Sequence, residues 1–287
     1  MDEIVSTQKL TKVYGPIKAV QDLDLSVYRG EVFGFLGPNG AGKTTTIRIL
    51  TTLTKPTSGR ASVNGYDVVD EPSKVKNVIG VVQQHLSLDR DLTIRENMEF
   101  RARLHHLNSS ERRHRINELL EYVDLTEYAD RVIDSLSGGM KKRAAIVNAL
   151  LHNPAVLFLD EPTVGLDAQA RRRLWDLIRR LSNDGTTIFL TTHYIEEAET
   201  LCQRVGILHR GRLIALGKPS ELRQELGQIT VETLVNNRGT RYQYFRDKNA
   251  ATQYVQNLPP EVKTIVIRES NLEDVFVELT GQKVDGE

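Results

Sequence analysis

A glycine-rich segment at residues 37–44 carries the most specific chemistry in this sequence. It runs Gly-Pro-Asn-Gly-Ala-Gly-Lys-Thr and satisfies the phosphate-loop pattern G-x-x-x-x-G-K-[ST]. Residues 31–36 before it favour a strand, and residues 44–50 after it favour a helix. In that context the glycines let backbone N–H groups converge on phosphate oxygens, and the helix start adds partial positive charge. We therefore expect this loop to bind the phosphates of a nucleotide.

The two side chains that end this loop have distinct predicted roles. Lys43 would place a positive charge on the β- and γ-phosphates, and the Thr44 hydroxyl would bind Mg²⁺. The alternative, a glycine-rich turn that contains a lysine by chance, does not explain the flanking strand and helix. The predicted nucleotide-binding residues of the loop are Gly37, Pro38, Asn39, Gly40, Ala41, Gly42, Lys43, Thr44 and Thr45.

Two adjacent carboxylates, Asp160 and Glu161, follow an unbroken apolar run at residues 156–159. Such a run is typical of a parallel strand buried on both faces, and open α/β sheets bind ligands at the carboxyl ends of their strands. We expect Asp160 to hold Mg²⁺, directly or through water, and Glu161 to polarise the water that attacks the γ-phosphate. An acidic pair after a strand is also common on loop surfaces, but a phosphate loop requires a metal ligand nearby.

A second anion-binding helix start is predicted at Ser137-Gly138-Gly139, because residues 140–151 favour a helix. A chain with one phosphate loop has no evident use for two such helix starts. The simplest explanation is a head-to-tail pair of identical chains, in which each chain lends this segment to the nucleotide bound by the other.

The elements around these segments indicate an α/β fold. Residues 187–190 form another short apolar run, and Leu174, Leu177 and Ile178 recur between the two runs at helical spacing. Strand, helix and strand in that order predict a crossover within a parallel sheet. Nearer the N-terminus, residues 22–27 alternate apolar and polar side chains, as in a half-buried strand.

Local signals outside the parallel sheet divide the rest of the chain. Asn64-Gly65 predicts a hairpin turn, and the capping-box pattern Thr93-Ile-Arg-Glu96 opens a mostly helical stretch at about residues 90–135. The composition shifts near residues 217–228, and residues 220–287 favour a small α+β appendage. Its predicted elements are a helix at 220–226, strands at 228–235, 242–245 and 262–268, and a helix at 271–280.

Composition excludes several classes of protein. Lys+Arg and Asp+Glu are equal at 38 each, so no global field draws the chain to nucleic acid, and we expect no nucleic-acid partner. The single cysteine, Cys202, excludes an intrachain disulfide framework and a cysteine-based zinc site. We expect neither a secretory signal nor a membrane-spanning helix, which needs about 20 apolar residues.

Other residues that could bind a metal or a ligand are interpreted as structural. His85 and the pair His105-His106 lack partners at metal-ligand spacing. Trp175 lies in the middle of a predicted helix and is predicted to be a packing residue.

The order of these segments resembles the nucleotide-binding subunit of ATP-binding cassette (ABC) transporters, over about residues 4–217. The resemblance implies an α/β fold: a P-loop NTPase (RecA-like) core with an antiparallel β subdomain and an inserted α-helical subdomain at about residues 85–150. It assigns residues 1–219 to an ABC ATPase domain, which is followed by the α+β appendage at residues 220–287.

The resemblance also implies roles for single residues. Tyr14 matches the aromatic that stacks on adenine, 23 residues before the phosphate loop, and Gln84 matches the glutamine that contacts Mg²⁺ and senses the membrane partner. Leu166-Asp167 matches the loop that crosses the dimer seam, and His193 matches the switch histidine on the γ-phosphate. Ser137-Gly138-Gly139 matches the signature loop. The catalytic residues so implied are Glu161, His193 and Lys43, and the metal-binding residues are Thr44, Gln84 and Asp160.

Two positions depart from the family pattern. The signature usually ends in glutamine, but this chain has Met140, and the helix behind it has Asn148 where arginine is usual. Because methionine forms no strong hydrogen bond, we expect a weaker ribose contact at the site that the signature loop completes.

Within the family, the chain resembles the ATPases of bacterial and archaeal ABC-2-type exporters, including drug-resistance and sodium-efflux groups. The matching segments are residues 136–140, 191–198 and 272–281. This implies an ATP hydrolase at the cytoplasmic face of the cell membrane, with ATP and Mg²⁺ as cofactors. Its implied partners are a second copy of itself and a separate integral-membrane permease.

The alternative function is a soluble ABC-type ATPase that acts on a non-transport partner. A translation-associated protein of this kind would carry two cassettes, and this chain has one. A chromosome- or repair-associated ATPase would carry a long coiled coil, but 51 residues separate Gln84 from Leu136. A nucleotide-sensing regulator would be expected to lose the carboxylate that activates water, yet Glu161 is in place.

Overall fold

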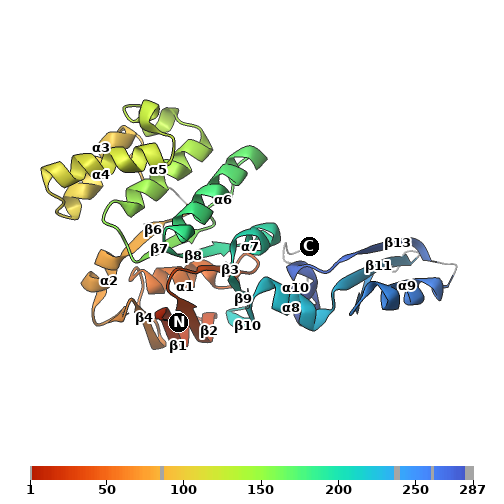
Figure 1. Ribbon diagram of the computed structural model, residues 1–287. Coiled ribbons are helices and arrows are strands. Elements are labelled where there is room, and N and C mark those ends of the chain that lie inside the picture. The colour runs from red at the N-terminus through yellow and green to blue at the C-terminus, as the bar shows by residue number, and fades with distance from the viewer. Residues whose placement is uncertain (1, 85–86, 236–239, 260–261, 282–287) are drawn as a thin grey trace.

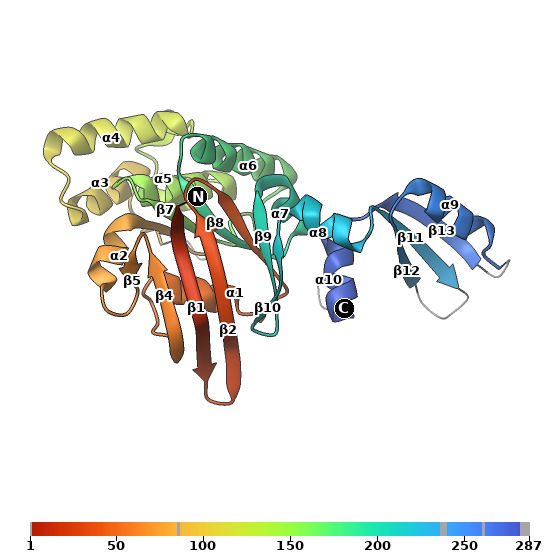
Figure 2. The same cartoon turned by 60° about the horizontal axis from the view of Figure 1, so that its bottom comes forward.

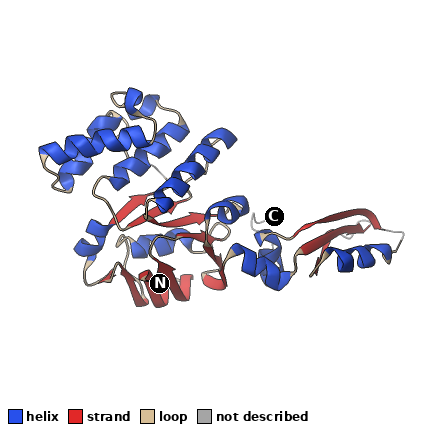
Figure 3. Cartoon of the chain, in the orientation of Figure 1, coloured by secondary structure: helices blue, strands red, loops and turns tan. Residues whose placement is uncertain are grey.

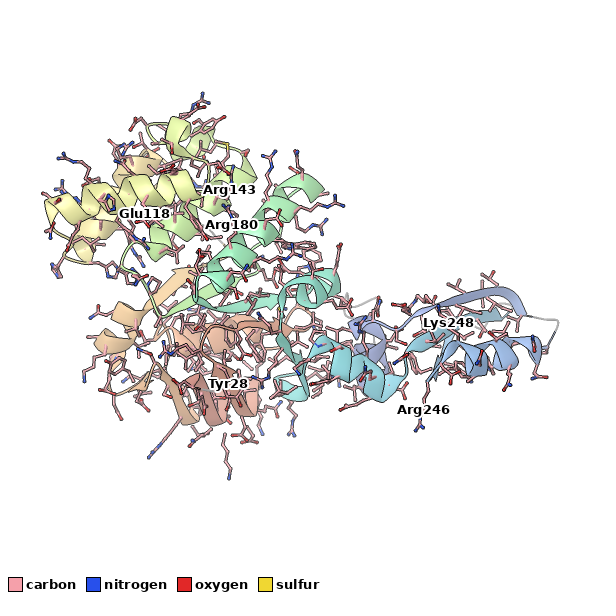
Figure 4. All side chains as sticks on the ribbon, in the orientation of Figure 1. Tyr28, Glu118, Arg143, Arg180, Arg246 and Lys248 are labelled. Carbon is pink, nitrogen blue, oxygen red and sulfur yellow. The ribbon has the colours of Figure 1, made fainter. Side chains whose placement is uncertain are left out.

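The computed structural model describes residues 2–84, 87–235, 240–259 and 262–281. It has a large unit of two sheets and several helices, from which a smaller unit projects at the C-terminal side (Figure 1). The α/β fold expected from the sequence is confirmed. Tyr28 lies in the large unit, whereas Arg246 and Lys248 lie in the projecting one (Figure 4).

A six-stranded sheet organises the large unit. Its strand order is β10-β9-β3-β8-β7-β6, in which β9, β3, β8, β7 and β6 run parallel and β10 is an antiparallel edge. Strands β7 and β8 are buried at every residue, as the apolar runs in the sequence predict. The strands are β3 (Val32–Leu36), β6 (Ile79–Val82), β7 (Val156–Asp160), β8 (Thr187–Thr192), β9 (Arg204–His209) and β10 (Arg212–Gly217).

One face of this sheet packs against helix α1 (Lys43–Leu50) and a four-stranded sheet of order β2-β1-β4-β5. Leu23, Leu25 and Val27 are buried, as their alternation predicts, and the hairpin at Asn64-Gly65 is confirmed. Tilted and edge-to-face phenylalanine rings fill the space between the layers. The strands of the second sheet are β1 (Glu3–Tyr14), β2 (Ile17–Tyr28), β4 (Ser58–Val63) and β5 (Tyr66–Asp67).

The other face is covered by helices, several of which form the helical part above the sheet in Figure 2. The predicted capping box is present, because Thr93 Oγ1 accepts from Glu96 N at 3.1 Å and Glu96 Oε2 accepts from Thr93 N at 2.8 Å. The helices of the large unit, besides α1, are α2 (Pro72–Val78), α3 (Ile94–Leu104), α4 (Ser109–Tyr122), α5 (Gly138–Leu150), α6 (Ala168–Asn183) and α7 (Ile195–Leu201), with short 3₁₀ turns at Thr126–Tyr128 and Ile133–Ser135.

The segment after residue 219 has two structurally different parts. A three-stranded sheet of order β12-β11-β13 and helix α9 enclose a small core of their own (Figure 3). Helices α8 and α10 instead bury Leu222 and Phe276 in the core of the large unit. The predicted helices and strands are present, and α9 is an addition that the sequence did not indicate. The elements are α8 (Pro219–Leu226), β11 (Ile229–Val235), β12 (Thr240–Phe245), α9 (Lys248–Gln256), β13 (Val262–Glu269) and α10 (Leu272–Thr280).

In the described residues, none of the helices combines the length and the apolar character that crossing a membrane requires.

Candidate nucleotide-binding site

The glycine-rich loop connects β3 to α1, so the predicted strand–loop–helix context is confirmed. Two of its glycines are required by close packing. A Cβ on Gly37 would lie 2.4 Å from Leu208 O, and a Cβ on Gly42, whose φ is 108°, would lie 2.4 Å from Ala19 O. Larger residues would therefore push the loop away from β9 and β2, and the backbone N–H groups could not converge.

Lys43 lies inside the curve of this loop, and 4% of the residue is exposed. Its Nζ donates to Gly37 O at 2.6 Å and to Pro38 O at 3.1 Å, and it lies 3.4 Å from Glu161 Oε1. Burial lowers the pKa of Lys43, and the negative charges of Glu161 and Asp160 oppose this effect. The ammonium group thus holds the loop in shape and faces both carboxylates.

Asp160 and Glu161 are positioned by Thr191 at the end of the neighbouring strand β8. Thr191 Oγ1 donates to Asp160 Oδ1 at 2.6 Å, and it accepts from Glu161 N at 3.1 Å. Asp160 Oδ1 also lies 3.3 Å from Thr44 Oγ1 at the start of α1. Sequence reasoning missed Thr191, although a threonine pair that ends an apolar strand just before His193 could have suggested it.

Glu161 is held in an uncommon backbone conformation at the centre of these groups. Its φ is 47°, in the left-handed region that non-glycine residues seldom adopt, and 7% of the residue is exposed. Glu161 Oε1 lies 3.4 Å from Lys43 Nζ and 3.4 Å from His193 Nδ1. The three predicted catalytic side chains therefore meet at one carboxylate oxygen.

These groups lie in a cleft of about 930 Å³. From the predicted site it is lined by Asn39, Gly40, Gly42, Lys43, Thr44, Thr45, Gln84, Glu161 and His193. Tyr14 lies at the end of β1, is 45% exposed, and its ring is covered by the Lys12 ammonium 4.8 Å from the centroid. It does not line the cleft, although Pro16 and Ile17 just after it do. The adenine-stacking role of Tyr14 stays a prediction.

The segment Ser137-Gly138-Gly139 lies elsewhere. Ser137 is the N-cap of α5, and its Oγ accepts from Met140 N at 3.3 Å, so the predicted helix start is confirmed. The segment borders a separate hollow of about 450 Å³, which Asp167 also lines. The structure therefore does not bring this second helix start to the phosphate loop of the same chain.

Comparison with known proteins identifies the family. A family model described as ABC transporter matches residues 20–164. The chain is 38% identical to the daunorubicin resistance ATP-binding protein DrrA3 of Streptomyces coeruleorubidus, over 98% of this chain and 96% of that protein. The chain belongs to the ABC transporter family.

Two further similarities agree with this assignment. The ABC chain is 37% identical to the Nod factor export ATP-binding protein I of Cupriavidus metallidurans, over 99% of both chains. A solved dimeric structure of the ATP-binding cassette MJ0796, bound to ADP and Pi, is 31% identical, with a TM-score of 0.68, over 75% of this chain and 98% of that chain. The protein is thus an ATP-binding and ATP-hydrolysing ABC subunit.

The two departures from the ABC pattern have different surroundings. Met140 lines the hollow beside the signature loop, where its thioether adds an apolar contact. Asn148 is buried in α5, and its Oδ1 has no hydrogen-bond partner among the residues that the structure describes.

Of the histidines interpreted as structural, His105 packs against another ring. His105 stacks on His152 with ring centroids 3.8 Å apart, and burial lowers the pKa of His152 to about 4. No group of three or more potential metal-ligating side chains is found within the described part of the chain. His85 lies outside the described residues. Trp175 is buried, as expected, and its Nε1 donates to Glu197 Oε1 at 3.2 Å.

Proposed function

We propose that this chain is the ATPase subunit of an ABC-2-type exporter and works as a head-to-tail homodimer with two shared nucleotide sites. The observation that carries the proposal is the separation of the two anion-binding helix starts. The phosphate loop faces one cleft, and Ser137 faces another hollow. A nucleotide contacted by both must lie between two copies of the chain. The solved structure of the ATP-binding cassette MJ0796 is dimeric, which supports a site that involves two chains.

In the proposed site, the chain acts by positioning and charge. The N–H groups of the phosphate loop and Lys43 hold the β- and γ-phosphates, and Glu161 accepts a proton from the attacking water. His193, 3.4 Å from the same carboxylate oxygen, orients that water against the γ-phosphate. Positioning and electrostatic stabilisation account for most of the catalysis of phosphoryl transfer.

The side chains near Thr44 fit a magnesium ion. Thr44 Oγ1 and Asp160 Oδ1 lie 3.3 Å apart and Gln84 lines the same cleft, which supplies the hard oxygen donors that Mg²⁺ prefers. Bound there, the ion would neutralise charge on the β- and γ-phosphates. Thr44, Asp160 and Gln84 are the residues that would hold it.

The membrane role rests on similarity to exporter ATPases. Drug-resistance and Nod factor export ATP-binding proteins match this chain over nearly its full length. We infer a peripheral location at the cytoplasmic face of the membrane, with a separate permease as partner. We also infer the boundary between an ATPase domain at 1–219 and an appendage at 220–287, with the qualification that α8 and α10 pack on the ATPase core.

Substitution of Glu161 by glutamine tests the proposed function. Glu161→Gln should bind ATP but hydrolyse it about 100- to 1,000-fold more slowly, because the general base is lost. With ATP and Mg²⁺ the variant should accumulate a dimer in analytical ultracentrifugation. Glu121→Gln, the same change at an exposed position on α4, is the matched control. Normal turnover by Glu161→Gln, or a monomer at saturating ATP, would contradict the proposal.

A further inference from the structure

Lys142 is a buried lysine that the proposed mechanism leaves unused. It is the fifth residue of α5, the helix that begins with the signature loop, and 5% of it is exposed. Helix α5 packs tightly on β6, since a Cβ on Gly80 would lie 2.7 Å from Ala149 O. The lysine therefore lies on a rigid contact between the signature helix and the strand that leads to Gln84.

The Lys142 ammonium reaches the backbone of the segment after β6. Its Nζ lies 3.5 Å from Gln83 O and 3.4 Å from Gln84 O. Gln84 lines the nucleotide cleft, and Ser137 at the start of the same helix borders the other hollow. The Lys142 side chain thus connects the two half-sites of a single chain: the phosphate half-site, which is the cleft at the phosphate loop, and the signature half-site, which is the hollow beside Ser137.

Packing alone does not account for a charge at this position. Burial lowers the pKa of Lys142, and Asp160, Glu197 and Glu161 oppose that effect by their negative charge. An apolar side chain of similar length would avoid the desolvation cost of the ammonium group. The charge is instead accounted for by the two backbone carbonyl groups that Lys142 Nζ contacts.

We propose that Lys142 is a positioning residue that fixes the Gln84 segment to the signature helix. Through its two carbonyl contacts it keeps the Gln84 side chain within reach of the metal site and makes the two half-sites of one chain move together. The effect on the metal site rests on the proposed function, whereas the contact between Lys142 and the Gln83 and Gln84 carbonyls does not.

Hydrogen exchange of the full-length chain tests the contact without using activity. In Lys142→Met, the amides of Gln83 and Gln84 should exchange about tenfold faster, because the restraint on their carbonyls is lost. Lys142→Arg, which keeps charge and donors, should stay close to wild type. Lys141→Met is the matched control, because Lys141 on the same helix pairs with Asp134 at 3.3 Å and not with the Gln84 segment.

A second measurement links the contact to the metal site. The Mg²⁺ concentration that half-saturates ATP hydrolysis should rise about tenfold in Lys142→Met, as for other residues that orient a metal ligand. Lys142→Gln should be intermediate, and it replaces Lys142→Met if the latter does not fold. The inference would be overturned if hydrogen exchange at the Gln83 and Gln84 amides, or the Mg²⁺ dependence of ATP hydrolysis, is the same in Lys142→Met and Lys142→Gln as in wild type. Absence of ATP hydrolysis by the wild-type chain, with the exchange result intact, would instead contradict the proposed function.

Discussion

The two helix starts predicted to bind anions differ in their exposure and in the charge that the chain places beside them. At the phosphate loop, Lys43 is 4% exposed and contacts two loop carbonyls and Glu161. At the signature loop, Ser137 and Gly138 are exposed. The phosphate half-site thus has a buried cation of its own, whereas the signature half-site is exposed and its helix start is capped only by the Ser137 hydroxyl, which accepts from Met140 N. A helix N-terminus left exposed in this way is ready for an anion supplied from elsewhere.

The two glycines of the signature loop, Gly138 and Gly139, differ in how closely the rest of the chain packs against them. A Cβ on Gly139 would lie 2.9 Å from Ala170 Cβ, so this glycine is needed for packing of α5 on α6. A Cβ on Gly138 would meet Leu166 Cδ2 at 3.5 Å, which is an ordinary contact. Gly138 is therefore not required by the fold of the single chain.

The largest effect is expected where the phosphate half-site is broken. Lys43→Ala should weaken ATP binding at least about 30-fold, because a buried charged donor is removed and Glu161 loses the ammonium group that lies 3.4 Å from it. Titration with a fluorescent ATP analogue measures this effect. Lys76→Ala, at an exposed position on α2, is the control and should bind normally. Equal affinities in both variants would remove Lys43 from the site.

A smaller and more selective effect is expected at the signature half-site. Gly138→Ala should keep the melting temperature and the ATP affinity of the monomer, but reduce ATP-dependent dimerisation about tenfold, since the added methyl group lies at the exposed helix start where the second chain is proposed to bind. Gly139→Ala should lower the melting temperature as well, because its Cβ meets Ala170. Calorimetry and ultracentrifugation separate the two outcomes. If Gly138→Ala dimerises as fully as wild type, the signature loop does not take part in ATP-dependent dimerisation.

The smallest effect is expected in the projecting unit. Ser270 N donates to Gln228 O at 2.9 Å, so residues 229–269 can be replaced by a short glycine linker without moving α8 or α10. Asp274→Asn must accompany this excision, because it removes Arg268, which binds Asp274 at 2.6 Å and 2.8 Å. ATP hydrolysis and dimerisation should stay within about twofold of wild type, since the excised core is separate.

The contrasting variant for this last prediction lacks residues 220–287 altogether. It should aggregate, because it uncovers the part of the large core that Leu222 and Phe276 fill. A large loss of dimerisation after the limited excision would show instead that the projecting sheet belongs to the dimer interface.

Much of the site could be predicted from sequence, because it is made of local patterns. The phosphate loop and the acidic pair each follow directly after an apolar strand. A few consecutive residues therefore show both the functional groups and the strand end that positions them. Helix α9 was missed for a related reason: its apolar residues, Ala251, Tyr254 and Val255, are too few to stand out before their contacts with Ile229 are known. The roles of Thr191 and Lys142 were missed because each depends on a partner far away in the chain.

The sequence by itself determined the family, the strand–loop–helix context of the glycine-rich segment, the buried strands β7 and β8, and the carboxylate pair at the end of β7. These follow from the periodicity of apolar side chains and from glycines that no other residue can replace. The tertiary structure decided which groups meet: Thr191 with both carboxylates, Lys142 with the Gln84 backbone, and α8 and α10 with the ATPase core. Those contacts join residues that are distant in the chain, and no local pattern encodes them.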